Sequence, residues 1–278
     1  MKRIGFVDNN LENYHANVYL KLLRNDLKDR GFTVDGCFGT QQSSGREWAE
    51  KNGVPYFSDV RALNDAVDYY MILAPSNPET HFDLCQKVFP FGKPTYVDKT
   101  FAPNLAIAKR IFALADKHKI PMQTTSALRY TEVQDYVNSV GRKNVQHMIT
   151  YVAGGSFGEY AVHPIELFVS CMGPNVKRLM RRGTKNQTQL LLDLTGNRTA
   201  VVNVFPKTRT PYAASVTTNE ETKYFAIDTS KIFLNTASAV LDLFETGKPN
   251  IDRKESLIIR RIQDVADQKR ALKGFVQL

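Results

Sequence analysis

Strand-like and helix-like segments alternate through the first 125 residues of the chain. Short apolar runs predict strands, and the stretches between them carry the apolar spacing of amphipathic helices. The predicted strands are residues 3–7, 32–38, 68–74, 94–97 and 121–125, and the predicted helices are residues 11–31, 46–52, 80–88 and 104–119. This alternation predicts an α/β Rossmann-type fold, a doubly wound parallel sheet, in residues 1–125.

The pattern changes after about residue 126, where strand-like segments follow one another. The predicted strands are residues 145–153, 176–184, 187–194, 199–205 and 213–218, with a further candidate at 224–227. The predicted helices are residues 131–140, 161–172, 232–245 and 256–273. Consecutive strands favour antiparallel pairing, so residues 126–278 are predicted to form an α+β domain with a mostly antiparallel open sheet. Its C-terminal helix is a candidate to pack back on the first domain.

The formal net charge of +9 is concentrated in the second half. Residues 1–125 hold 16 Lys and Arg against 14 Asp and Glu, whereas residues 126–278 hold 21 against 14. Acidic residues interrupt the positive charges near the C-terminus, so we expect no nucleic-acid partner.

No run of 18 apolar residues is present, and the charged start does not fit a signal peptide. Three widely spaced cysteines favour a reducing compartment, so we expect a cytoplasmic protein without a membrane partner.

The turn after the first predicted strand reads Asp8-Asn9-Asn10-Leu11 and contains no glycine. A dinucleotide-binding fold usually has a glycine-rich turn here, which lets a pyrophosphate approach the backbone and the helix N-terminus. Asn and Asp tolerate the backbone of tight turns, but the charge of Asp8 opposes an anion. This segment alone leaves two interpretations open: a plain strand–helix turn, which it favours, or a degenerate cofactor loop.

The turn after the second predicted strand, residues 39–46, has hydroxyl groups and an arginine but no carboxylate. NAD-binding folds usually place an acidic residue there for the ribose hydroxyls. Thr40 and Arg46 instead suit a 2′-phosphate, so a nicotinamide cofactor is predicted to be NADP rather than NAD. A polar loop without a ligand is the alternative interpretation.

Several later segments carry motifs that are similar to those of one known enzyme family. The family has the pattern T-P-N-x-x-H, followed by a helix and then by G-K-H-V-x-x-E-K-P. Pro75, Asn77 and His81 are similar to the first part of this pattern, and Asp98-Lys99-Thr100 is similar to the end of the second part. The family motif D-x-G-x-H-x-x-D resembles a segment with Glu159, Ala161, His163 and Glu166 at the same four spacings. Arg129-Tyr130 and the tail, residues 244–249 and 276–278, also agree. The chain therefore resembles the Gfo/Idh/MocA oxidoreductase family nearly from end to end.

The resemblance implies hydride transfer between a nicotinamide cofactor, NADP or NAD, and a sugar- or polyol-like alcohol. Such a reaction needs a cation to hold the developing alkoxide and a base to take the hydroxyl proton. The resemblance assigns Lys99 to the first role and His163 to the second, with Glu159 orienting His163 or binding a substrate hydroxyl. We also expect Pro164 to open a helix, whose dipole would favour a neutral His163.

The remaining candidate residues fall into two groups, and no metal site is expected. The substrate-binding candidates are Arg129 and Tyr160, although an arginine in such a domain often forms a structural ion pair. The cofactor-binding candidates are Asp8, Asn9, Asn10, Leu11, Thr40, Arg46, Pro75, Ser76, Asn77, His81 and Asp98. The resemblance further implies that residues 126–278 bind substrate and form a homodimer or homotetramer through their sheet.

A non-catalytic family member that has lost dinucleotide binding is the alternative. The missing glycines, the missing ribose carboxylate, and Thr100 and Ala161 at family Pro and Gly positions favour this alternative. The presence of both Lys99 and His163 favours the enzyme, because a scaffold needs neither.

Overall fold

The computed structural model describes residues 2–278, which form two compact units. The first unit comprises the chain up to Thr125 together with Phe233–Asp252, and the second comprises Ser126–Ile232 and Arg253–Leu278. The division after Thr125 falls where the strand–helix alternation ends. Residues 233–252, which the sequence analysis placed in the second domain, are part of the first unit, whereas the C-terminal helix is part of the second.

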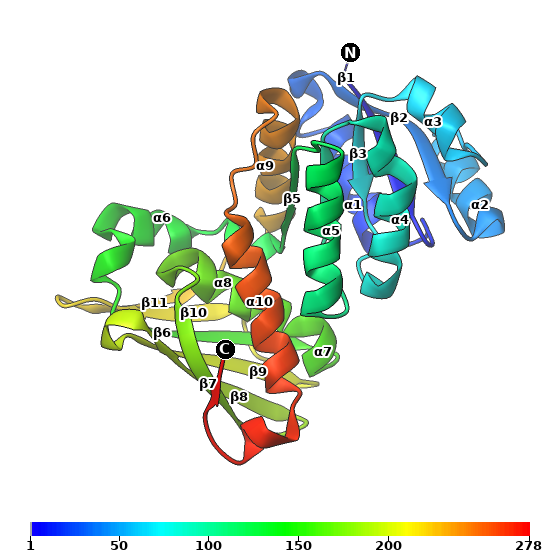
Figure 1. Cartoon of the computed structure of the whole chain (residues 1–278). Coiled ribbons are helices and arrows are strands. Elements are labelled where there is room, and N and C mark those ends of the chain that lie inside the picture. The colour runs from blue at the N-terminus through cyan, green and yellow to red at the C-terminus, as the bar shows by residue number, and fades with distance from the viewer. Residues whose placement is uncertain (1) are drawn as a thin grey trace. The chain divides into compact units, whose positions relative to one another are not determined.

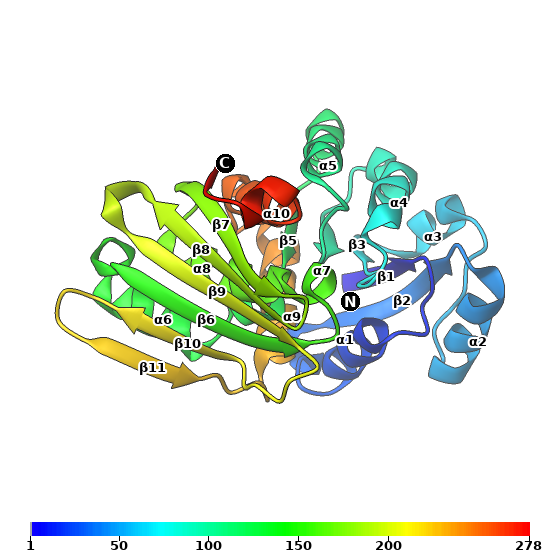
Figure 2. The ribbon, with the colours of Figure 1, turned by 90° about the horizontal axis from the view of Figure 1, so that it is seen from below.

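The first unit contains a five-stranded parallel sheet in the order β2-β1-β3-β4-β5 (Figure 1). Its strands are β1 (Lys2–Asp8), β2 (Phe32–Gly39), β3 (Tyr69–Ile72), β4 (Thr95–Asp98) and β5 (Met122–Thr125). One face carries α3 (Val60–Ala66), α4 (His81–Val88) and α5 (Leu105–Lys117), and the other carries α1 (Tyr14–Arg24) and α9 (Ile232–Thr246), with α2 (Gln42–Asn52) beside β2 (Figure 2). The predicted doubly wound parallel sheet is confirmed.

Helix α9 joins the first unit through its apolar side chains. Val240 and Phe244 belong to the same buried cluster as Tyr19 and Trp48. The ring of Phe244 also stacks on Tyr69, with 4.8 Å between the ring centroids. Burial of such side chains is the main favourable contribution to folding, and it explains why a segment so distant in sequence completes this core.

The second unit contains a seven-stranded sheet in the order β11-β10-β6-β9-β8-β7-β12. The strands are β6 (His147–Gly154), β7 (Val176–Thr184), β8 (Gln187–Leu194), β9 (Thr199–Pro206), β10 (Ala213–Thr217), β11 (Thr222–Ala226) and β12 (Val276–Gln277). Within this sheet, as far as the structure describes it, β6 and β9 pair in parallel and all the other neighbouring strands pair antiparallel. One face of this sheet is covered by helices, and the other face is open (Figure 2). The helices are α6 (Glu132–Val140), α7 (Phe157–Tyr160), α8 (Val162–Met172) and α10 (Arg253–Ala266). The predicted mostly antiparallel open sheet is confirmed.

Several local predictions were wrong in detail. Helix α1 begins after Leu11, because the side chain of Asn13 caps it by accepting the backbone N–H of Ala16. Helix α2 begins inside the predicted turn, and α3 was not predicted. A separate helix, α7, precedes α8, so Pro164 is the third residue of α8 rather than its first.

Candidate functional site

Asp8 ends β1 and turns its carboxylate into the protein, where the residue is 1% exposed. Its Oδ1 accepts the Asn10 backbone N–H at 3.0 Å, and its Oδ2 accepts the Asn13 amide at 2.9 Å and the Ala74 backbone N–H at 2.8 Å. Burial raises the pKa of this carboxyl to about 6, although the three hydrogen bonds favour the ionised form. Asp8 thus ties the loop after β1 to the loop after β3.

The two asparagines that follow present amide groups to the same turn. Asn9 Oδ1 accepts the Thr40 hydroxyl at 2.6 Å, and Asn10 Oδ1 accepts the Glu12 backbone N–H at 3.1 Å. Neither Nδ2 group donates to an acceptor within the described part of the chain, so both N–H₂ groups are available to a ligand. Leu11, by contrast, is fully buried in the apolar core and cannot offer its side chain.

The turn after β2 leads directly into α2. The residue before this helix, Gln41, makes no side-chain bond to the first-turn N–H groups. Thr40 and Ser43 are exposed, and the Ser43 hydroxyl donates to Glu47 at 3.2 Å. Arg46 lies one turn into the helix with its guanidinium 4.8 Å from the ring centre of Tyr56. Uncapped N–H groups at a helix start attract anions, so this turn is suited to a phosphate.

The loop after β3 is held by backbone and histidine contacts. Ala74 adopts a left-handed backbone with φ of 42°, and its carbonyl oxygen accepts the Asn77 N–H at 3.0 Å. His81 is fully buried, with its ring nitrogens 3.0 Å from the carbonyl oxygen of Phe101 and 2.8 Å from that of Leu73. His81 therefore fixes this loop to the segment after β4, and its side chain is enclosed by protein.

Lys99 follows β4 and is only 8% exposed. Its ammonium donates to the carbonyl oxygen of buried Pro75 at 3.2 Å and forms no ion pair within residues 2–278. An ammonium has three N–H donors, so two remain for a ligand. The neighbouring loop residue Ser76 is exposed to solvent. The peptide bond between Lys99 and Thr100 is cis.

His15 was missed by the sequence analysis. Its Nδ1 lies 2.5 Å from Oδ2 of the buried Asp98, whose Oδ1 accepts the Tyr96 hydroxyl at 3.0 Å and the Lys99 backbone N–H at 2.8 Å. Burial alone raises the pKa of Asp98, but the charge and hydrogen bond of His15, together with Lys99, hold it below its ordinary value. Asp98 therefore anchors the backbone of Lys99. Only the place of His15 in the first turn of α1 could have signalled this pair.

His163 is half-buried in the first turn of α8. Its Nδ1 lies 2.6 Å from Oγ of Ser126, and the ring of Tyr160 is 5.9 Å from the imidazole, centre to centre. Glu159 is exposed on α7, where its backbone N–H donates to Ser156. The structure thus brings Tyr160 and the unpredicted Ser126 to His163. Ser126 gave no signal in the sequence, because it lies 37 residues away and matches no quoted motif.

Arg129 is buried between two carboxylates of the second unit. Its Nε donates to Glu166 at 2.7 Å and its Nη1 to Glu255 at 2.6 Å. Burial alone lowers the pKa of Arg129, but the two carboxylates outweigh it and raise the value. Arg142 donates to the other oxygen of Glu255 at 3.0 Å. These four residues form a charge-balanced network that is buried except for Arg142, and it matches the structural ion pair considered for Arg129.

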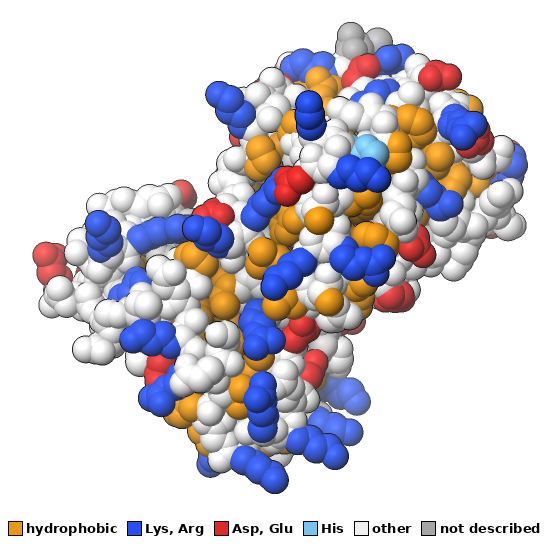
Figure 3. Space-filling view, in the orientation of Figure 1, with side chains coloured by type: hydrophobic (Ala, Val, Ile, Leu, Met, Phe, Trp, Pro, Cys, Tyr) orange, Lys and Arg blue, Asp and Glu red, His pale blue; other side chains and the backbone are white. Residues whose placement is uncertain are grey.

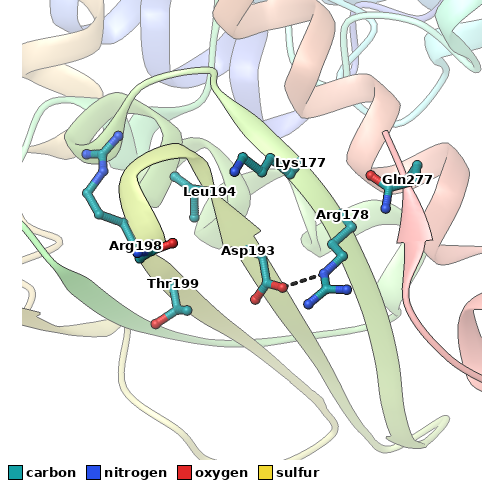
Figure 4. Close-up of a pocket in the computed structure, with 8 residues that line it drawn as sticks. Lys177, Arg178, Asp193, Leu194, Arg198, Thr199 and Gln277 are labelled. Atoms are coloured by element: carbon teal, nitrogen blue, oxygen red, sulfur yellow. Dashed lines mark hydrogen bonds and ion pairs between the residues drawn. The ribbon is translucent and has the colours of Figure 1, made fainter.

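A surface pocket of about 450 Å³ lies beside β7, β8 and β9 (Figure 4). The residues that line it are Lys177, Arg178, Asp193, Leu194, Asn197, Arg198, Thr199 and Gln277, and none of them is a predicted site residue. Asp193 pairs with Arg178 at 2.5 Å, which leaves the pocket positive. Elsewhere on the face in Figure 3, Lys and Arg side chains are separated by uncharged and apolar surface.

The described residues show neither a membrane-spanning helix nor a metal-binding cluster. Within residues 2–278, no helix is long and apolar enough to cross a membrane. No three His, Cys, Asp or Glu side chains within the same residues lie together in a way that could hold a metal ion.

Comparison with known structures shows the fold along the whole chain. A probable dehydrogenase from Thermotoga maritima is 14% identical with a TM-score of 0.84, and the match covers 99% of this chain and 98% of that one. The scyllo-inositol dehydrogenase of Lactobacillus casei, solved with NAD(H) and scyllo-inositol, is 12% identical with a TM-score of 0.82, covering 100% and 99%. An oxidoreductase from Agrobacterium radiobacter, in complex with NAD⁺, L-tartaric acid and magnesium, is 15% identical with a TM-score of 0.77, covering 99% and 98%.

Sequence comparison gives a family match for the first part of the chain. No curated protein matches the chain in sequence. The sequence profile described as "Oxidoreductase family, NAD-binding Rossmann fold" matches residues 8–126, which begin at Asp8 and include every candidate of the first unit. Over residues 8–126, the chain therefore matches the model of the Gfo/Idh/MocA oxidoreductase family.

Proposed function

We propose that the protein is an NAD(P)-dependent oxidoreductase that transfers hydride between the nicotinamide ring and the hydroxyl carbon of a sugar- or polyol-like alcohol. The observation that carries this proposal is the environment of Lys99. Its ammonium is almost fully buried, yet its hydrogen-bond partner is a neutral carbonyl and it forms no ion pair among the described residues. The nearby Asp98 carboxylate, whose charge it feels, is held by His15. A buried cation of this kind is costly unless it serves a ligand, and an alkoxide oxygen suits it.

The first unit can bind a dinucleotide although the turn after β1 contains no glycine. The amide N–H₂ groups of Asn9 and Asn10 would donate to the pyrophosphate, in place of backbone N–H groups. Asp8 directs its carboxylate to three internal donors, which reduces its repulsion of an anion. Asn77 and Ser76 are proposed to line the same region. The cofactor, when bound, supplies the carbon that accepts or releases the hydride.

The reaction itself needs a cation and a proton carrier. We assign to Lys99 the stabilisation of the alcohol oxygen as its negative charge develops, and to His163 the transfer of the hydroxyl proton. Tyr160 and the exposed Glu159 are proposed to bind substrate hydroxyls. Arg129 is instead assigned a supporting role, because its guanidinium is enclosed by two carboxylates.

We propose NADP as the preferred cofactor. The turn after β2 has no acidic residue, and the first N–H groups of α2 receive no side-chain cap. Thr40, Ser43 and Arg46 are exposed around this helix start. Equilibrium titrations with NADPH and NADH test the preference, and Arg46→Ala should weaken NADPH more than NADH. Equal losses for both cofactors would exclude the 2′-phosphate contact.

The substrate class rests on the implied family chemistry, supported by the inositol dehydrogenase among the similar structures. The decisive experiment combines cofactor titration with turnover on a panel of sugars and polyols. Lys99→Met should retain NADPH affinity and lose turnover by about 100-fold or more, as expected when a positioned transition-state donor is removed. Equal turnover in the variant would remove Lys99 from the mechanism.

A binding protein without catalysis is the second candidate function. The absence of glycine from the Asp8–Asn13 turn favours it. Failure of both NADPH and NADH to bind at millimolar concentration would establish this alternative over the oxidoreductase.

We further propose a homodimer or homotetramer that forms through the open sheet of the second unit. Ile149, Val201, Leu191 and Met180 lie opposite one another on neighbouring strands and form a half-buried apolar row. Such a row on an exposed sheet face favours association. Val201→Lys should lower the mass measured by light scattering to that of a monomer. A wild-type monomer would contradict the proposal.

A cytoplasmic location is also proposed. Cys37, Cys85 and Cys171 are all free and buried, and burial raises the pKa of Cys37 to about 12. A reducing compartment suits thiols without disulfide partners. Fractionation of cells that express the protein tests this location.

A further inference from the structure

We propose that Ser126 is a positioning residue that determines which ring nitrogen of His163 carries the proton. The inference rests on the proposed role of His163 in proton transfer. It assigns to a neutral hydroxyl the orienting function that the family resemblance gives to Glu159. Ser126 and His163 belong to the same compact unit of the molecule.

The contact is short and enclosed. Ser126 is fully buried, and its Oγ lies 2.6 Å from Nδ1 of the half-buried His163. The same Oγ lies 3.4 Å from the backbone N–H of Leu128, since Ser126 precedes the short 3₁₀ turn Ala127–Arg129. The hydroxyl therefore faces the imidazole at hydrogen-bond distance while its backbone begins a turn.

The backbone of Ser126 is fixed by the buried ion network. Its N–H donates to Oε2 of Glu166 at 2.8 Å, and Oε1 of Glu166 accepts Nε of Arg129 at 2.7 Å. Arg129 is held in turn by Glu255. A side chain supported in this way loses little entropy when it orients a ring, which is the property required of a positioning residue.

The chemistry distinguishes a serine from a carboxylate at this place. For alcohol oxidation, Nε2 must hold a lone pair, so the neutral ring carries its proton on Nδ1 and donates it to Ser126 Oγ. When Nε2 takes the hydroxyl proton, the ring becomes a cation and the Nδ1–H bond to Ser126 remains. A carboxylate in place of the hydroxyl would hold that cation and oppose release of the proton. Ser126 orients the ring without adding charge.

The first test needs no cofactor and no turnover. The tautomer of His163 is measured on the full-length protein by ¹⁵N NMR of its five histidines, with the signals of His163 assigned from their loss in His163→Gln. We expect Nδ1 protonation in the wild-type protein and a shift toward Nε2 protonation in Ser126→Ala. Identical ring-nitrogen shifts in both proteins would overturn the proposal, whether or not the protein is an oxidoreductase.

The second test uses the turnover. Ser126→Ala should lower kcat about 10-fold with little change in KM, as expected when a general base loses its orientation, and Ser126→Thr should restore it. Ser126→Asp should move the acidic limb of the pH profile to higher pH by about one unit or more. Ser170→Ala is the matched control, because it removes another buried hydroxyl that does not contact His163. A pH profile unchanged in Ser126→Asp would overturn the proposal; if the wild-type protein shows no turnover, the NMR result alone decides it.

Discussion

Lys99 in the first unit and Arg129 in the second are both buried cations, each 8% exposed. Both also belong to segments that resemble family motifs. Lys99 meets one carbonyl oxygen, whereas Arg129 meets two carboxylates. A cation whose charge is neutralised by two carboxylates stabilises the fold, whereas a cation without an ion pair can serve an anionic ligand. Burial and motif membership are therefore weaker evidence of function than the set of partners.

The largest expected effect comes from Arg129, the cation that is paired with carboxylates. Glu255→Gln removes the charge that both Arg129 and Arg142 require and turns an amide N–H₂ toward a guanidinium. Breaking a buried ion pair from one side costs about 3–5 kcal/mol, so we expect the free energy of unfolding in urea to fall by about 3 kcal/mol. If the free energy of unfolding fell by less than 1 kcal/mol, water or a rearrangement of side chains would be compensating the lost charge. The difference in structural role between Arg129 and Lys99 would then be smaller.

The second effect is a pH dependence from Asp8. Its pKa of about 6 in the folded protein exceeds its ordinary value of 3.8, so the folded state binds the proton more tightly. Lowering the pH from about 7 to about 4.5 should therefore stabilise the protein by about 2 kcal/mol through this group. The depressed pKa of Asp98 acts in the opposite sense, but its contribution is lost only as the pH falls below the ordinary range of a carboxyl.

The measurement for Asp8 is the difference between wild-type protein and Asp8→Asn across that pH range. The absolute stability of the variant does not matter, because only the pH slope is compared. Parallel curves for the two proteins would place the pKa of Asp8 at its ordinary value and would contradict its buried, inward orientation.

Lys99→Met is the stability counterpart of the Glu255 variant. The methionine keeps most of the apolar volume of the lysine side chain. It removes an ammonium whose hydrogen-bond partner in the described residues is the neutral carbonyl of Pro75. We expect the free energy of unfolding to change by less than about 1 kcal/mol, since replacing a poorly compensated buried charge is often neutral. A loss as large as that of Glu255→Gln would assign Lys99 a structural role and remove the distinction between the two cations.

The sequence predicted regular elements better than the partners of side chains. Strands β7 and β8 were predicted at the observed bounds, because the turn residues Thr184-Lys185-Asn186 separate the two strands and Thr195-Gly196-Asn197 follows β8. The residues that form helix α9 were predicted, but the unit in which the helix packs was not. An apolar stripe shows that a helix packs against a hydrophobic core, but it does not show which core. His163 was predicted from its motif, whereas Ser126, its partner, depends on the tertiary fold and has no local signature.

The smallest effect concerns a glutamate with the same kind of partners as Glu255 but in solvent. Glu245 pairs with Lys2 at 2.7 Å and with Arg30 at 2.7 Å, while its side chain remains 32% exposed. Exposed ion pairs contribute about 0–1 kcal/mol and are screened by salt, so Glu245→Gln should cost less than 1 kcal/mol, and even less at high ionic strength. The two Glu→Gln variants change the same atoms and differ in burial. If unfolding titrations gave equal losses for both, burial would not explain the strength of the Arg129 network, and the partner set alone would have to explain it.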